Sequence, residues 1–235
     1  MENIFYNNRV DAGLRLAEFL KKMSLLDPLI IALPRGGVIV GNEVATSMNC
    51  TLDVLMARKI GHPRYPELGI GALSEDEIPF FSPDSVKYVS HTSEQVLDTI
   101  GRERVELRRR VDLYRPKRNL TEVKGREVVV VDDGLATGVT ASSAGRFLRG
   151  LNPFKLILAV PVGPVKIPDF LQDQFDEIYC LHSVIDFKSV GEHYAEFPQV
   201  SDEEVLDIMN SRYPLQKNGK PFKKPYQPGL ESGAI

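Results

Sequence analysis

The segment of residues 128–140 (VVVVDDGLATGVT) constrains the fold more than any other part of the sequence. Four consecutive valines predict a strand that is covered on both faces, as strands are within a parallel sheet. Two aspartates follow, and small residues then lead into an expected helix at 139–149. Ligands of open α/β sheets bind beyond the carboxyl ends of such strands, where the next helix offers unpaired backbone N–H groups. The segment therefore predicts a ligand site at the edge of a parallel sheet.

The hydrophobic pattern extends this layout along the chain. Apolar runs predict further strands at 29–33, 52–57, 69–73, 155–160 and 177–181. Helical spacing predicts helices that begin after Asn7 or Asn8, at about 38–48 and at about 93–114. Strands that alternate with helices indicate an α/β fold, with a twisted, mainly parallel sheet flanked by helices. From about Pro63 to Phe81 the chain is rich in Gly and Pro, which favours a long mobile excursion.

Composition excludes several classes of protein. No apolar run reaches the roughly 18–20 residues that span a bilayer, and the N-terminal residues lack the layout of a secretion signal, so we expect a cytoplasmic protein without membrane contact. The two cysteines, Cys50 and Cys180, lack metal-site spacing, and we expect buried, inert thiols.

The charge distribution separates the last residues from the rest. Of the net charge of −3, residues 211–235 contribute five Lys/Arg and one Asp/Glu, which leaves about −7 for residues 1–210. We therefore expect one domain over 1–210 and a flexible basic tail over 211–235. The acidic domain makes nucleic acid an unlikely partner, since only the tail would suit it.

The loop after the valines has the residues of a phosphate cradle. Gly134 and Gly138 permit close backbone approach. Successive backbone N–H groups and hydroxyls come from Ala136, Thr137, Gly138, Val139 and Thr140. Val139 stands where a P-loop would require lysine, and no GxGxxG fingerprint is present.

Asp132 and Asp133 are ionised at neutral pH and accept hydrogen bonds only. Beside a phosphate cradle they suit sugar hydroxyls or a hydrated Mg²⁺. The alternative interpretation is a helix cap on an ordinary β–α turn.

Two basic segments follow other expected strands. Gly36 and Gly37 expose backbone N–H groups, and Arg35 adds a forked cation suited to a diphosphate. Arg58 and Lys59 end the strand expected at 52–57 and provide further cations. A plain Gly-Gly turn and ordinary strand-end charges are the alternatives.

Together these motifs resemble those of type I phosphoribosyltransferases, and the whole layout over about residues 5–208 resembles one bacterial phosphoribosyltransferase-like branch of that family. Four hydrophobic residues, two acids and GxxTGxT resemble the family's signature for phosphoribosyl diphosphate (PRPP). The resemblance implies that Asp132 and Asp133 hold the ribose hydroxyls and that residues 136–140 cradle the 5′-phosphate. It also implies a diphosphate loop at 33–37 with a cis Pro34–Arg35 bond, and basic residues Arg58 and Lys59 before a catalytic loop.

By this resemblance the chain would transfer a 5-phosphoribosyl group from Mg·PRPP to a small acceptor, with a nucleobase as the expected class, and release diphosphate. Arg35, Lys59, Asp132 and Asp133 would be the catalytic residues, and Mg²⁺ would be held through PRPP and water. Ala136 stands where hypoxanthine/guanine-type enzymes have an acid, so the sequence does not identify the acceptor.

The resemblance also implies a small hood, built from residues 182–210 and the N-terminal segment. Its aromatic residues Phe187, Tyr194 and Phe197 either stack on a flat ring or pack on the core. A non-catalytic PRPP or nucleotide sensor and a phosphoribosyl hydrolase are the rival functions, and the sequence leaves a homodimer open.

Overall fold

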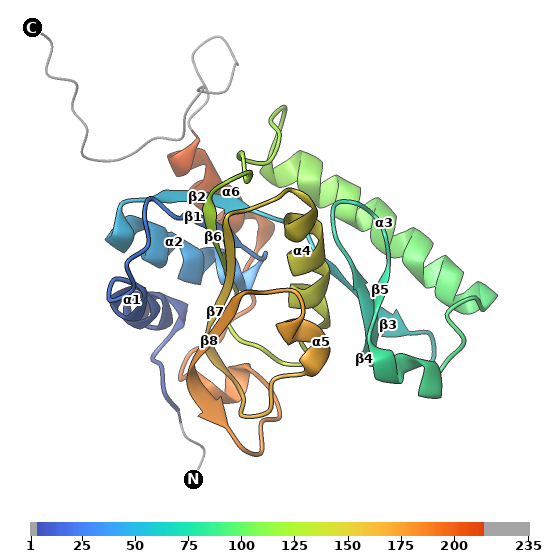
Figure 1. The fold of residues 1–235 in the computed structure, drawn as a ribbon. Coiled ribbons are helices and arrows are strands. Elements are labelled where there is room, and N and C mark those ends of the chain that lie inside the picture. Colours follow the sequence, from blue (N-terminus) through green and yellow to red (C-terminus); the bar gives the residue numbers. More distant parts are fainter. Residues whose placement is uncertain (1–3, 214–235) are drawn as a thin grey trace, which may run out of the picture.

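The structure is a computed structural model that describes residues 4–213. A five-stranded parallel sheet with helices on both faces lies beside a smaller antiparallel sheet (Figure 1). In spatial order the parallel strands are β2 (Thr51–Val54), β1 (Leu29–Ala32), β6 (Glu127–Val131), β7 (Lys155–Pro164) and β8 (Glu177–Val184). The helices are α1 (Arg9–Leu20), α2 (Gly36–Met48), α3 (Glu94–Tyr114), α4 (Val139–Gly150), α5 (Asp169–Gln172) and α6 (Asp202–Arg212). The predicted α/β class with a mainly parallel sheet is confirmed.

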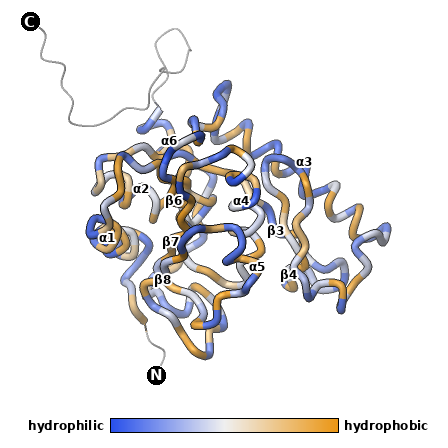
Figure 2. The backbone as a smooth tube through the Cα atoms, in the orientation of Figure 1, coloured by the Kyte–Doolittle hydropathy of each residue, from blue (hydrophilic) through white to orange (hydrophobic). Residues whose placement is uncertain are grey.

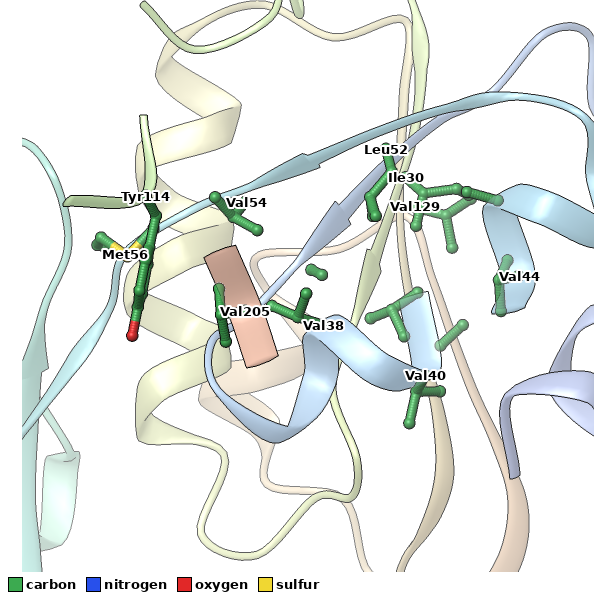
Figure 3. Packing of buried hydrophobic residues seen from close by; sticks show 14 of the residues in the cluster. Ile30, Val38, Val40, Val44, Leu52, Val54, Met56, Tyr114, Val129 and Val205 are labelled. Carbon is green, nitrogen blue, oxygen red and sulfur yellow. The ribbon is translucent and has the colours of Figure 1, made fainter. Parts of the chain in front are cut away.

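Each face of the parallel sheet has its own hydrophobic core, because side chains alternate along a strand. The odd-numbered valines of β6, Val129 and Val131, face α1 and α2, and the even-numbered Val128 and Val130 face α4 and α5. In Figure 3 the valines of α2 lie against strand side chains such as Ile30. Figure 2 shows the same arrangement as hydrophobic colour along the central strands. The run of valines is therefore buried on both faces, as predicted.

The segment expected as a mobile excursion is an antiparallel sheet. Its strands are β3 (Arg58–His62), β4 (Tyr65–Leu73) and β5 (Phe80–Phe81), and α3 packs beside them (Figure 1). We call β3, β4, β5 and α3 the arm. The expected strand at 69–73 is only the second half of β4, and β2 ends at Val54 rather than Ala57. The sequence did not predict the hairpin, because the outer half of β4 is exposed and lacks the apolar run of a buried strand.

The N-terminal segment pairs with the residues that precede α6. The backbone N–H of Phe5 donates to the carbonyl of His193 at 3.0 Å, and that of Ala195 donates to Tyr6 at 2.8 Å. Tyr6 and Tyr194 form a parallel bridge. The two parts of the predicted hood thus lie side by side, while its role over a base stays a prediction.

The described chain continues past the predicted domain boundary at 210. Helix α6 runs to Arg212, and the Tyr213 hydroxyl donates to the Leu52 carbonyl at 2.8 Å. The predicted tail from 214 to 235 lies outside the described residues. Among residues 4–213, no helix is both long and apolar enough to cross a membrane.

Both cysteines are free thiols, and only Cys50 is buried as expected. Cys50 is buried, which raises its pKa to about 12, and Cys180 is half-buried with its pKa also raised by burial.

Candidate functional site

The acidic pair follows β6 directly and is partly buried. The backbone N–H of Asp133 donates to Asp132 Oδ1 at 2.8 Å. Burial raises the pKa of both carboxyls, and the neighbouring Asp133 charge raises that of Asp132 further. At Asp133 the guanidinium of Arg9 opposes this rise. The pair is therefore two adjacent carboxylates whose ionisation depends on nearby cations.

Arg9 is a site residue that the sequence interpretation missed. Its Nε donates to Asp133 Oδ2 at 2.8 Å, although Arg9 opens a helix far from Asp133 in the sequence. The available signal was its position: Arg9 shares the buried face of α1 with Ala12, Leu16 and Leu20. A charge on an apolar helical face needs a buried partner.

The loop after β1 touches the acidic pair. The Pro34–Arg35 bond is cis, as the family resemblance implied. A Cβ atom at Gly36 would lie 1.8 Å from Asp133 Oδ2, and one at Gly37 would lie 2.9 Å from the Asp132 Cα. Only glycine fits at Gly36 without displacing the carboxylate. Gly36 and Gly37 are the first two residues of α2 rather than part of a loop that ends at 37 as predicted, so the amino end of this helix lies against the acidic pair.

The loop after the acidic pair leads into the amino end of α4. Gly138 precedes the helix with φ of +76°, the left-handed region that favours glycine. Ala136 and Thr137 are exposed, Thr140 is half-buried and Val139 is buried. The first N–H groups of α4 thus lie at the end of an exposed loop, which suits an anion.

Arg58 and Lys59 lie at the start of β3 in the arm, not at the end of β2 as predicted. The reason is that β2 ends at Val54 and a short connection separates the strands. Arg58 pairs with Glu103 of α3 at 2.6 Å, and Lys59 lies 3.8 Å from Glu67.

A cavity of about 320 Å³ joins these cations to the β1 loop. Its lining comes from the β1 loop, the arm hairpin and α3: Pro34, Ala57, Arg58, Lys59, Gly61, His62, Pro63, Pro66, Thr99, Arg102, Glu103 and Arg110. Four of these side chains are Arg or Lys and one is Glu, so the cavity is electropositive and suits an anion. The arm also reaches the α4 loop, since a Cβ at Gly69 would lie 3.1 Å from the Lys59 side chain and 3.7 Å from Val139.

Asp202 is a second residue that the sequence interpretation missed. Arg35 Nη1 lies 3.6 Å from Asp202 Oδ1, at the amino end of α6. Arg109 of α3 pairs with the other oxygen at 3.1 Å, and the Tyr114 hydroxyl donates to Oδ1 at 2.5 Å. The hydrogen bond from Tyr114, as the largest cause, and that from Arg109 lower the pKa of Asp202. Arg109 therefore links α3 to the amino end of α6.

The hood aromatics pack on the protein in this structure. Tyr194 is buried beside Tyr6, and its hydroxyl donates to the Asp133 carbonyl at 2.6 Å. The Phe197 ring lies 3.7 Å from the Arg9 guanidinium carbon, and Phe187 stacks on His193 with ring centroids 5.3 Å apart. For Tyr194 the interpretation as a core residue holds.

Among residues 4–213 no group of three His, Cys, Asp or Glu side chains is arranged to hold a metal ion. The oxygens of Asp132 and Asp133 suit a hard cation such as Mg²⁺ only if other ligands complete its shell.

Comparison with known proteins identifies the class. The sequence model of the phosphoribosyl transferase domain matches residues 7–194. The chain therefore belongs to the phosphoribosyl transferase family, and the predicted family and fold are confirmed.

Two Mycobacterium tuberculosis proteins, from strains CDC 1551 / Oshkosh and ATCC 25618 / H37Rv and each named "Putative phosphoribosyl transferase", are 39% identical to this chain over 206 residues. The match covers 87% of this chain and 46% of each relative, so the chain spans about half the length of these relatives. The crystal structure of TT1426 from Thermus thermophilus is 36% identical, with a TM-score of 0.72 over 87% of this chain and 97% of that one.

Proposed function

We propose that the chain transfers a 5-phosphoribosyl group from Mg·PRPP to a small acceptor and releases diphosphate. The contact between Gly36 and the Asp133 carboxylate carries the proposal. It joins the loop suited to a diphosphate to the pair suited to a ribose, and the amino end of α4 follows that pair directly. One edge of the sheet thus offers a place for each part of PRPP.

The donor half uses groups with matching chemistry. Asp132 and Asp133 accept hydrogen bonds from the ribose 2′- and 3′-hydroxyls. Residues 136–140 donate backbone N–H groups and Thr hydroxyls to the 5′-phosphate, where the dipole of α4 also favours an anion.

The residues that would bind the diphosphate leaving group have the main catalytic task. The bond from C1 to the diphosphate oxygen breaks, the acceptor forms a bond to C1, and the transition state is oxocarbenium-like, as in glycoside cleavage. Charge accumulates on the diphosphate, so Arg35, the Gly36 and Gly37 amides and Lys59 stabilise it. Mg²⁺ bound with PRPP would neutralise part of the same charge.

The acceptor side is a nucleobase site by the family resemblance, and the hood covers it. Ala136 offers no proton acceptor, so the group that takes the proton of the attacking atom lies elsewhere or belongs to the acceptor itself. The hood contributes an apolar surface to the acceptor site, and the loop that contains Ala136 contributes no acid.

The test is a titration with PRPP, with and without Mg²⁺, followed by measurement of diphosphate release with a panel of bases. We expect Mg²⁺-dependent PRPP binding and release that requires a base. No PRPP binding would contradict the proposal. Binding without release would indicate a sensor, and release without a base would indicate a hydrolase.

A further inference from the structure

Arg9 makes three contacts that together join the hood to the acidic pair. Its Nε donates to Asp133 Oδ2 at 2.8 Å, and its Nη1 donates to the Pro198 carbonyl at 2.7 Å. The same guanidinium lies 3.7 Å from the centre of the Phe197 ring. A planar guanidinium can satisfy all three at once, because its fork donates in the plane and its face stacks on an aromatic ring.

The surroundings leave this pair little freedom. Only 8% of the Arg9 side chain and 16% of the Asp133 side chain is exposed. A Cβ at Gly36 would lie 2.9 Å from Arg9 Nε, so the pair packs against the predicted diphosphate loop.

Asp133 is fixed through each of its polar groups. Arg9 holds the carboxylate, the Tyr194 hydroxyl holds the carbonyl at 2.6 Å, and Asp132 Oδ1 accepts from its amide at 2.8 Å. Arg9 occupies Oδ2, and a carboxylate has a second oxygen with its own lone pairs. Two of the three holding groups come from outside the β6 loop: Arg9 from α1 and Tyr194 from the hood.

We infer that Arg9 is a positioning residue that orients the Asp133 carboxylate for a ribose hydroxyl and ties it to the hood. This inference rests on the proposed function. Arg9 acts on the sugar through Asp133, and the diphosphate loop binds its own anion through Arg35 and backbone N–H groups. The loss of Arg9 therefore weakens ligands that contain a ribose more than it weakens diphosphate alone.

The experiment compares Arg9→Met, Arg9→Lys and the control Arg15→Met, with Mg·PRPP and inorganic diphosphate as probes. Arg15 lies on the same helix and pairs with Asp11 at 2.8 Å on an exposed surface. We expect Arg9→Met to weaken PRPP binding at least about tenfold, the effect of one charge-assisted hydrogen bond, and diphosphate binding less than about twofold. Arg9→Lys keeps the charge and should recover part of the loss, and Arg15→Met should bind both probes like wild type.

A double-mutant cycle with Asp133→Asn separates positioning from general damage. If Arg9 acts through Asp133, adding Arg9→Met to Asp133→Asn causes no further loss of PRPP affinity. Equal loss for both probes, or additive loss in the double variant, would overturn the inference and leave the proposed function intact. Failure of wild type to bind PRPP would instead reject the proposed function itself.

Discussion

The sheet edge and the arm hold their charged residues in different ways. At the sheet edge Arg9 and Asp133 are almost buried and meet at 2.8 Å. In the arm the side chain of Lys59 is 43% exposed, and its partner Glu67, 3.8 Å away, is fully exposed. Removal of one partner of a buried pair costs about 3–5 kcal/mol, whereas an exposed pair contributes about 0–1 kcal/mol. The buried pair therefore fixes the positions of its side chains at the sheet edge, whereas Lys59 of the arm contributes positive charge without a fixed position.

The largest effect is expected from Asp132→Asn combined with Asp133→Asn. Each carboxylate that accepts from a ribose hydroxyl contributes about 1.5–3 kcal/mol, so PRPP affinity should fall at least about 100-fold. Calorimetric titration measures this, with the exposed Asp84→Asn as the control. Binding like wild type would remove the sugar role from the pair.

Gly36→Ala tests how closely the edge is packed. The new Cβ would lie 1.8 Å from Asp133 Oδ2, and overpacking of this kind costs about 1–3 kcal/mol, so we expect roughly tenfold weaker PRPP binding and a lower Tm. Gly101 of α3 has open space around it, and Gly101→Ala in a helix should stabilise the protein by about 0.5–1 kcal/mol. If Gly36→Ala and Gly101→Ala lower Tm by the same amount, the sheet edge and the arm are equally closely packed.

Lys59→Ala tests the arm as a source of charge. We expect kcat for diphosphate release to fall by about tenfold, because a cation near the leaving group is lost, while Tm changes by less than about 4 °C. Rapid-quench assays and thermal melts measure the two. A large fall in Tm with unchanged kcat would reverse the distinction between the regions.

The smallest effect concerns stability and pH. Burial raises the pKa of Asp132 well above its ordinary value, so the folded protein keeps a proton there that the unfolded chain releases. Stability from this group is therefore lost as pH rises from the unfolded pKa towards the folded one. Asp132→Asn should raise Tm by about 2–4 °C at pH 8 and by less near pH 4, measured by calorimetry. A gain that is equal at both pH values would exclude ionisation as its cause.

Local sequence was sufficient to predict the donor loops. One continuous segment contains the valines, the acidic pair and the small residues before α4, so it predicted a strand, a loop and a helix together. The glycines after β1 predicted that the backbone there approaches a neighbour closely. Their roles towards PRPP stay predictions. Arg58 and Lys59, whose role stays a prediction, were placed on the wrong strand, because the end of β2 has no sequence marker.

Arg9 and Asp202 could not be predicted in the same way. Their partners are 124 and 167 residues away along the chain, and only the packing of α1 and α6 brings them to the loops. In the arm, α3 and the second half of β4 were predicted, but the hairpin was not, because the outer half of β4 is exposed. Exposed surface leaves no hydrophobic period from which to predict strands.

The close fit of Gly36 against Asp133 has a consequence for protein engineering. The β1 loop and the acidic pair come from adjacent parallel strands whose residues Ala32 and Val131 are in register. Neither loop can be exchanged alone for that of a relative unless the strand register is kept and glycine remains at position 36. The two loops therefore form a single transplantable module, and a change of donor specificity must redesign both together.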